Sequence, residues 1–82
     1  MKEIDERESA AGAVAMLISK VLGLRTVRHD TSIHNTLEWD SLAHLKMLDV
    51  LESHFGCQLD LEEVSEVQCV RDWIEVIDRH RR

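Results

Sequence analysis

Two stretches of this chain repeat apolar residues at the spacing of a helix face, and they limit the folds that it can adopt. Residues spaced three and four apart lie on the same side of an α-helix. The stripes consist of Val14, Leu17, Ile18, Val21 and Leu22, and of Val67, Val70, Trp73, Ile74 and Ile77. The sequence has no proline and only three glycines, so little interrupts a helix. We therefore predict an all-α fold.

Local signals divide the chain into four expected helices. Their approximate ranges are 6–22, 41–55, 60–64 and 66–80. Pairs with capping-box spacing, which satisfies free N–H groups at a helix start, are Asp5–Glu8, Asp60–Glu63 and Ser65–Gln68. Gly23 and Gly56 follow periodic segments, where glycine commonly ends a helix. At 82 residues, the chain is predicted to form one domain, 1–82, a four-helix bundle with a short third helix.

A long connection over residues 24–40 shows no helical repeat. We expect Ile33 and Leu37 to anchor it in the core, with a turn around residues 32–35. Trp39 either covers this loop or is exposed to a partner. A loop of this length in a small domain is often functional, so attention falls on the residues that it leads to.

Composition excludes some classes of function. Ten basic and sixteen acidic residues give a net charge of −6, which argues against nucleic-acid binding. The negative charge fits partners with basic docking patches, or it simply maintains solubility. Neither a signal peptide nor a membrane-spanning run is evident, so we expect a cytoplasmic protein that does not enter a membrane, with Cys57 and Cys69 reduced.

The histidines and cysteines show no spacing typical of a metal site. His44 and His54 are ten residues apart on the second expected helix, about 15 Å along its axis. They cannot share one ion at that separation, so we expect no metal and regard these imidazoles as solvated or half-buried.

The second expected helix begins with a chemically notable pair. Asp40 occupies the N-cap position, and Ser41 is the first helical residue. Free N–H groups and the helix dipole favour an anion there, such as a phosphate group. Asp40, Ser41 and His44 also suggest a nucleophilic site, but Gly-x-Ser-x-Gly and an evident oxyanion hole are lacking. We therefore expect no enzymatic activity.

Asp40-Ser41-Leu42, followed by an amphipathic helix, resembles the attachment site of the acyl and peptidyl carrier family. Trp39-Asp40-Ser41 is similar to a variant among discrete carriers, whereas Glu38 stands where the family often has Gly. The resemblance implies 4′-phosphopantetheine on Ser41, which would hold an acyl, aminoacyl or related group as a thioester. It also implies a monomer whose partners are a phosphopantetheinyl transferase, a loading enzyme and a downstream synthase or transferase.

Leu42 and Leu45 lie among charged residues on the second expected helix. They either widen the core stripe beneath the loop or form the apolar centre of a docking surface. The resemblance implies docking, and the expected partner-binding residues are Trp39, Leu42, Leu45, Lys46, Asp49, Glu52, Glu62 and Glu63. Glu62 and Glu63 either complement a helix dipole or form a second contact zone. The alternative function is a small helical adaptor that binds a partner through Leu42 and Leu45 without modification.

Overall fold

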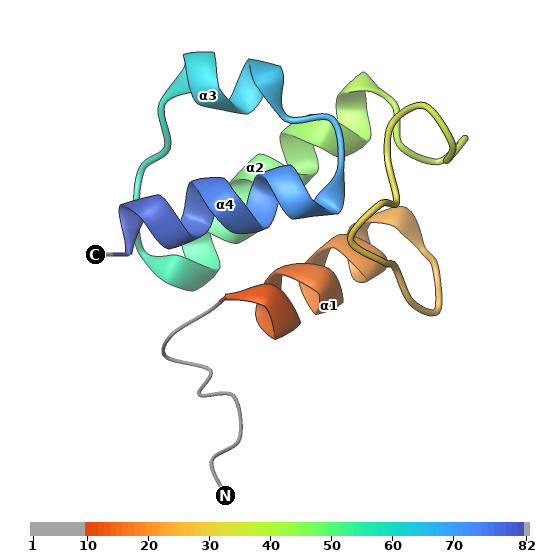
Figure 1. Cartoon of the computed structure of the whole chain (residues 1–82), viewed down its shortest axis with the longest axis horizontal. Coiled ribbons are helices and arrows are strands. Elements are labelled where there is room, and N and C mark those ends of the chain that lie inside the picture. Colours follow the sequence, from red (N-terminus) through yellow and green to blue (C-terminus); the bar gives the residue numbers. More distant parts are fainter. Residues whose placement is uncertain (1–9, 82) are drawn as a thin grey trace, which may run out of the picture.

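Four helices form the regular structure of the computed structural model, which describes residues 10–81 (Figure 1). Their bounds are α1 Ala11–Leu22, α2 Ser41–Phe55, α3 Leu61–Glu66 and α4 Val70–His80. Within the described range no strand forms, and Ser32 and Cys69 make an isolated antiparallel bridge. The prediction of an all-α, four-helix fold with a short third helix is confirmed.

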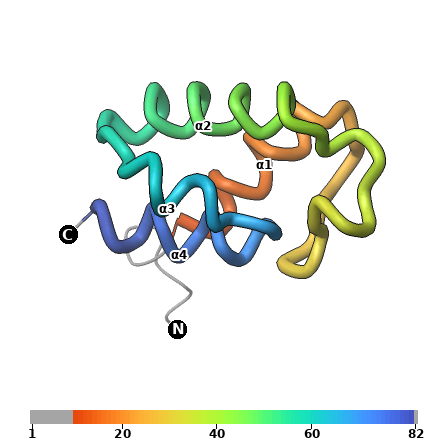
Figure 2. Tube along the Cα trace, turned by 90° about the horizontal axis from the view of Figure 1, so that it is seen from above, coloured from red at the N-terminus to blue at the C-terminus, as the bar shows by residue number. Residues whose placement is uncertain are grey.

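The core lies where α1, α2 and α4 face one another. α1 packs against both α2 and α4, and Figure 2 shows α2 and α4 along opposite edges of the molecule. The largest side chains that are completely buried are Trp73, Ile18, Met47, Leu51, Ile77, Val14 and Val70. Each of the three long helices contributes to this set, because each carries an apolar stripe at the helical period. Burial of these stripes is the main favourable contribution to folding.

Glycine ends α1 and α2 in the left-handed conformation. Gly23 has φ 72° and Gly56 has φ 65°, a region that costs other residues steric strain. At the end of α1 the N–H of Leu24 donates to the carbonyl oxygen of Ser19, 2.9 Å away, which satisfies a carbonyl that the helix leaves free.

The start of α2 at Ser41 is as predicted, whereas the start of α4 is not. α1 begins at Ala11, whereas the predicted start at residue 6 and the Asp5–Glu8 pair lie outside the described residues. The predicted fourth-helix start at residue 66 is wrong, because Ser65 and Glu66 belong to α3. The hydroxyl of Ser65 donates to the carbonyl oxygen of Glu62, 2.8 Å away, so it does not cap the following helix.

Backbone carbonyls of the long loop cap α4 instead. The N–H groups of Val70 and Arg71 donate to the carbonyl oxygens of Thr31 and His29, both at 3.0 Å. Cys69, at the N-cap position, makes no side-chain capping bond. Free N–H groups of a helix start need acceptors, and here a segment about 40 residues earlier in the chain supplies them.

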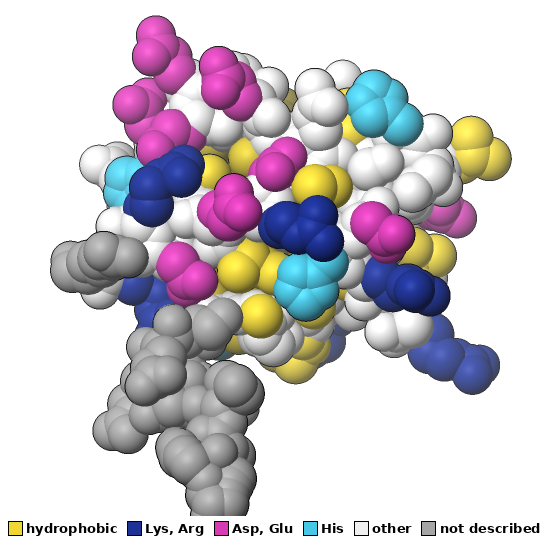
Figure 3. Space-filling model, viewed as in Figure 1, with side chains coloured by type: hydrophobic (Ala, Val, Ile, Leu, Met, Phe, Trp, Pro, Cys, Tyr) yellow, Lys and Arg dark blue, Asp and Glu magenta, His cyan; other side chains and the backbone are white. Residues whose placement is uncertain are grey.

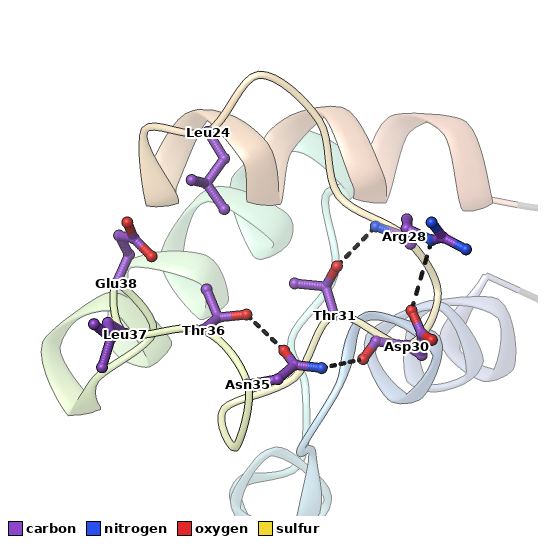
Figure 4. A pocket seen from close by; sticks show the side chains of 8 residues that line it. All are labelled: Leu24, Arg28, Asp30, Thr31, Asn35, Thr36, Leu37 and Glu38. Atoms are coloured by element: carbon purple, nitrogen blue, oxygen red, sulfur yellow. Dashed lines mark hydrogen bonds and ion pairs between the residues drawn. The ribbon is translucent and has the colours of Figure 1, made fainter.

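The predicted loop anchors are wrong. Leu37 is 98% exposed and Ile33 is 41% exposed, whereas Trp39 is buried at 3% and holds the end of the loop. The middle of the loop is fixed by polar contacts around a surface hollow (Figure 4). Its Asn35 side chain binds the carbonyl oxygen of Asp30, the N–H of Ser32 and the hydroxyl of Thr36. The expected turn over residues 32–35 is present, because the N–H of Asn35 donates to the carbonyl oxygen of Ser32.

Candidate functional site

Ser41 is an exposed residue at the start of α2. Asp40 has an extended backbone, with φ −105° and ψ −172°, and its Oδ1 accepts from the N–H of Ala43 at 2.9 Å. The expected N-cap is thus present, and such caps typically contribute about 1 kcal/mol to stability. The capped start places Ser41, an exposed residue, at the positive end of a four-turn helix. Among residues 10–81, positive φ occurs only at glycines, so Glu38 needs no left-handed backbone to reach this site.

A groove of about 550 Å³ adjoins Ser41. Its lining comes from the loop, the first turns of α2 and the α3–α4 region, and comprises Ile33, Trp39, Asp40, Ser41, His44, Leu45, Ser65 and Val67. Asp40 is the one carboxylate in this lining, and its Oδ1 is bound to the helix start. The groove therefore offers a mostly apolar surface directly beside the exposed serine.

His44 connects the loop to α3 beneath this groove. Its Nδ1 accepts from the indole Nε1–H of Trp39 at 3.1 Å, and its Nε2 lies 2.9 Å from the carbonyl oxygen of Val64. The centroid of its ring also lies 6.1 Å from that of Trp39 and 5.1 Å from that of Trp73. The expectation of a half-buried imidazole is met, but the sequence did not indicate these bonds, because no local spacing links His44 to Val64.

Trp39 does not present its side chain to a partner. It is 3% exposed and its indole N–H is bound to His44, so its expected place among the partner-binding residues is wrong. Of the two alternatives for Trp39, exposure to a partner and coverage of the loop, the structure favours coverage of the loop. The physical reason is that an indole gains more by burying its large apolar ring with its N–H satisfied than by remaining in water.

Leu42 and Leu45 are exposed rather than packed beneath the loop. Their exposed fractions are 61% and 59%, so they do not extend the core stripe of α2. Lys46 and Asp49 are exposed on the same helix. Glu52 is half-buried, and its Oε2 accepts from the N–H of Leu59 at 2.8 Å, so this carboxylate holds the segment after α2.

Acidic side chains gather over α3 (Figure 3). Glu62 is exposed, whereas Glu63 is half-buried and lies 3.4 Å from Arg79 and 2.7 Å from Nε2 of His80. The hydrogen bond from His80, aided by the charge of Arg79, lowers the pKa of Glu63. Glu62 is therefore the freer of these two carboxylates, while Glu63 joins α3 to the end of α4.

Cys57 is a half-buried free cysteine. Burial, with a smaller effect of the Glu52 carboxylate, raises its pKa above the ordinary value for cysteine. A thiol with a raised pKa is a weaker nucleophile at neutral pH, because the thiolate is the reactive form.

Two further classes of feature were sought in residues 10–81. No group of three or more His, Cys, Asp or Glu side chains there is placed to hold a metal ion. Over the same range, every helix is too short or too polar to cross a membrane.

Comparison with known protein families shows the family to which this chain belongs. The family model described as phosphopantetheine attachment site matches residues 12–77, most of the chain. The chain belongs to this phosphopantetheine-binding carrier family. It is a carrier protein for intermediates tethered to phosphopantetheine, a cofactor that is covalently attached in this family. The resemblance inferred from Asp40-Ser41-Leu42 is thus confirmed at the level of the family.

Two solved structures share the fold of this carrier. A chain named as an acyl carrier protein from Mycobacterium tuberculosis is 19% identical, with a TM-score of 0.75 over 82% of this chain and 92% of that chain. The holo acyl carrier protein from Geobacter metallireducens is 24% identical, with a TM-score of 0.76 over 85% of this chain and 83% of that chain. No curated protein matches the sequence.

Proposed function

We propose that Ser41 is the attachment residue of this carrier and that the chain presents a phosphopantetheine-bound acyl or aminoacyl group to partner enzymes. The observation that carries the proposal is the exposure of Ser41 at the capped N-terminus of α2, inside the matched family region. A modifying enzyme must reach the hydroxyl, and N–H groups of the helix start favour the phosphate that it receives.

The residues around Ser41 fit this cofactor. Asp40 fixes the helix start, and the adjoining groove offers Ile33, Leu45 and Val67 to the uncharged parts of the arm or its cargo. When attached, the cofactor supplies a terminal thiol that holds cargo as a thioester. The domain itself is proposed to catalyse nothing, since its part is to hold and deliver the bound group.

The modification has a simple chemical balance. Coenzyme A supplies the group: a bond forms between the Ser41 oxygen and the phosphorus attached to pantetheine. The bond from that phosphorus to adenosine 3′,5′-bisphosphate breaks, and the serine hydroxyl releases its proton. A phosphopantetheinyl transferase is the proposed catalyst of this step, and a loading enzyme then adds the cargo.

Intact-mass measurement tests the proposal. Unmodified protein incubated with coenzyme A and a broad-specificity phosphopantetheinyl transferase is expected to gain one phosphopantetheine. Proteolysis and fragment sequencing should place the added group on the peptide containing Ser41. A protein that stays unmodified, alongside a reference carrier that is modified in the same tube, would favour the unmodified adaptor. A group found on another serine would relocate the site.

We place the docking surface for partner enzymes on the exposed part of α2. Leu42 and Leu45 form its apolar centre, flanked by Lys46 and Asp49, with Glu62 of α3 as an outlying contact. A small apolar centre with a charged rim suits an interface that forms and dissociates quickly. The same carboxylates would steer basic patches of a partner toward Ser41.

Truncating Leu42 or Leu45 to alanine is expected to weaken docking. Each change removes apolar area from the centre of the proposed interface, so KM for the transferase should rise about fivefold or more. Steady-state kinetics with varied carrier concentration measures this. Met16→Ala is the matched control, because Met16 is 46% exposed but lies on α1. Equal KM values for all four proteins would exclude this surface.

A further inference from the structure

Two neighbours of His44 specify the form of its imidazole. Nδ1 faces the indole N–H of Trp39 at 3.1 Å, and Nε2 faces the carbonyl oxygen of Val64 at 2.9 Å. An indole N–H can only donate, and a carbonyl oxygen can only accept. Both bonds therefore form only when the ring is neutral and carries its proton on Nε2.

We propose that neutral His44 is a positioning residue for Ser41, and that a proton on Nδ1 releases Trp39. A charged imidazole donates at both nitrogens, so Nδ1–H would oppose the indole N–H. Trp39 is 3% exposed, and its N–H would be left without an acceptor in a buried place. The bond to Val64 survives protonation, so the change is confined to the loop side of the imidazole.

Trp39 and Asp40 connect His44 to Ser41. Trp39 precedes Asp40, whose carboxylate caps α2, and the backbone N–H of Trp39 donates to the carbonyl oxygen of Thr36. Trp39 is buried, whereas most residues from 33 to 40 are exposed, so its indole fixes the end of the loop. Its release would loosen the cap and the presentation of Ser41. This consequence rests on the proposed modification of Ser41, whereas the tautomer itself does not.

Nearby charges do not replace the lost bond. The groups that are hydrogen-bonded to the ring of His44 or lie beside it as rings are uncharged: Trp39 from the loop, the Val64 carbonyl from α3, and Trp73 from α4. Glu38 and Lys46, ionisable residues close in the chain to Trp39 and His44, are exposed. The other ionisable residues of these elements are either hydrogen-bonded to other groups or exposed. Asp40 binds the N–H of Ala43, Glu63 binds His80, and Asp72 binds the N–H of Gln68, while Glu62, Glu66 and Arg71 are exposed.

Nuclear magnetic resonance of the unsubstituted protein tests the tautomer. Long-range ¹H–¹⁵N correlation near pH 8 is expected to show the proton of His44 on Nε2, in the neutral ring. On acidification, the indole N–H signal of Trp39 should move with the titration of His44. The control is His54, an exposed residue of the same helix, whose titration should leave that signal unmoved. A proton on Nδ1 at high pH, or a Trp39 signal indifferent to His44, overturns the proposal.

Two variants separate the two bonds. His44→Asn keeps an acceptor near the position of Nδ1 and does not titrate, whereas His44→Gln keeps a donor near Nε2 only. The rate of Ser41 modification is measured for the unsubstituted protein and for His44→Asn at each pH, so that the transferase's own pH dependence cancels in their ratio. We expect the rate of the unsubstituted protein relative to that of His44→Asn to fall about fivefold on acidification, across the pH range in which the magnetic-resonance signals of His44 change.

The outcomes distinguish the two proposals. A constant ratio with efficient modification overturns the positioning role of His44 while leaving Ser41 as the attachment residue. Absence of modification at every pH overturns the proposed function, and the magnetic-resonance result then still decides the tautomer. His44→Gln should be modified slowly at all pH values, and a rate equal to that of the unsubstituted protein would also count against the proposal.

Discussion

Ser41→Ala is expected to abolish the mass gain completely when the protein is incubated with coenzyme A and a transferase. Alanine lacks the oxygen that would bond to phosphorus, so no partial activity remains. Ser41 is exposed and Asp40 supplies the helix cap, so the free energy of unfolding should change by no more than about 0.5 kcal/mol. Circular dichroism and urea unfolding of the variant check that the fold persists.

Ser53→Ala is the matched control for this experiment. Ser53 is also an exposed serine of α2, but it lies in the last turn and not at the start. It should gain the full mass at an unaltered rate. Modification of Ser41→Ala, or its loss from Ser53→Ala, would contradict the assignment of Ser41 rather than the family of the chain.

Trp73→Ala is expected to have the largest effect on stability. Trp73 is completely buried, and its truncation leaves a cavity that costs about 3–5 kcal/mol. A domain of this length has a free energy of unfolding of about 4–12 kcal/mol, so the variant should be partly unfolded or close to it. Guanidinium unfolding followed by circular dichroism gives the difference, and a loss below about 1 kcal/mol would contradict the packing described.

Two further variants show whether the loss comes from cavity formation. Trp73→Phe keeps much of the apolar volume and removes a buried Nε1–H that has no partner among the described residues. It should cost less than half as much as Trp73→Ala, because the unpaired N–H carries its own penalty. Leu37→Ala, at a side chain that is 98% exposed, should change stability by no more than about 0.5 kcal/mol.

Helix interiors were predictable from the sequence, whereas the start of α4 was not. Apolar periodicity is local, and the residues that it marked, such as Val14 and Ile77, are completely buried. The start of α4 depends on carbonyl groups of His29 and Thr31, far away in the chain. A capping rule that compares residues three apart cannot see such acceptors, so it selected Ser65 instead.

The candidate site also has some features that were predictable from the sequence and others that were not. The cap at Asp40 and the exposed place of Ser41 follow from neighbouring residues, and both were predicted. The bonds of His44 to Trp39 and Val64 depend on how the loop and α3 meet, which no local pattern records. The prediction that Leu37 anchors the loop failed for a related reason, because hydrophobicity alone does not reveal which apolar residue of a loop is buried.

The hydrogen bonds between loop carbonyl groups and the start of α4 constrain the order in which these two segments can reach their final structure. While the chain emerges from the ribosome, residues 24–40 are synthesised before Val70 and Arg71, their eventual hydrogen-bond donors. The loop that leads to Ser41 therefore completes these hydrogen bonds only after residues 70 and 71 have left the ribosome. A transferase that recognises the completed loop would therefore act only after the start of α4 has been synthesised.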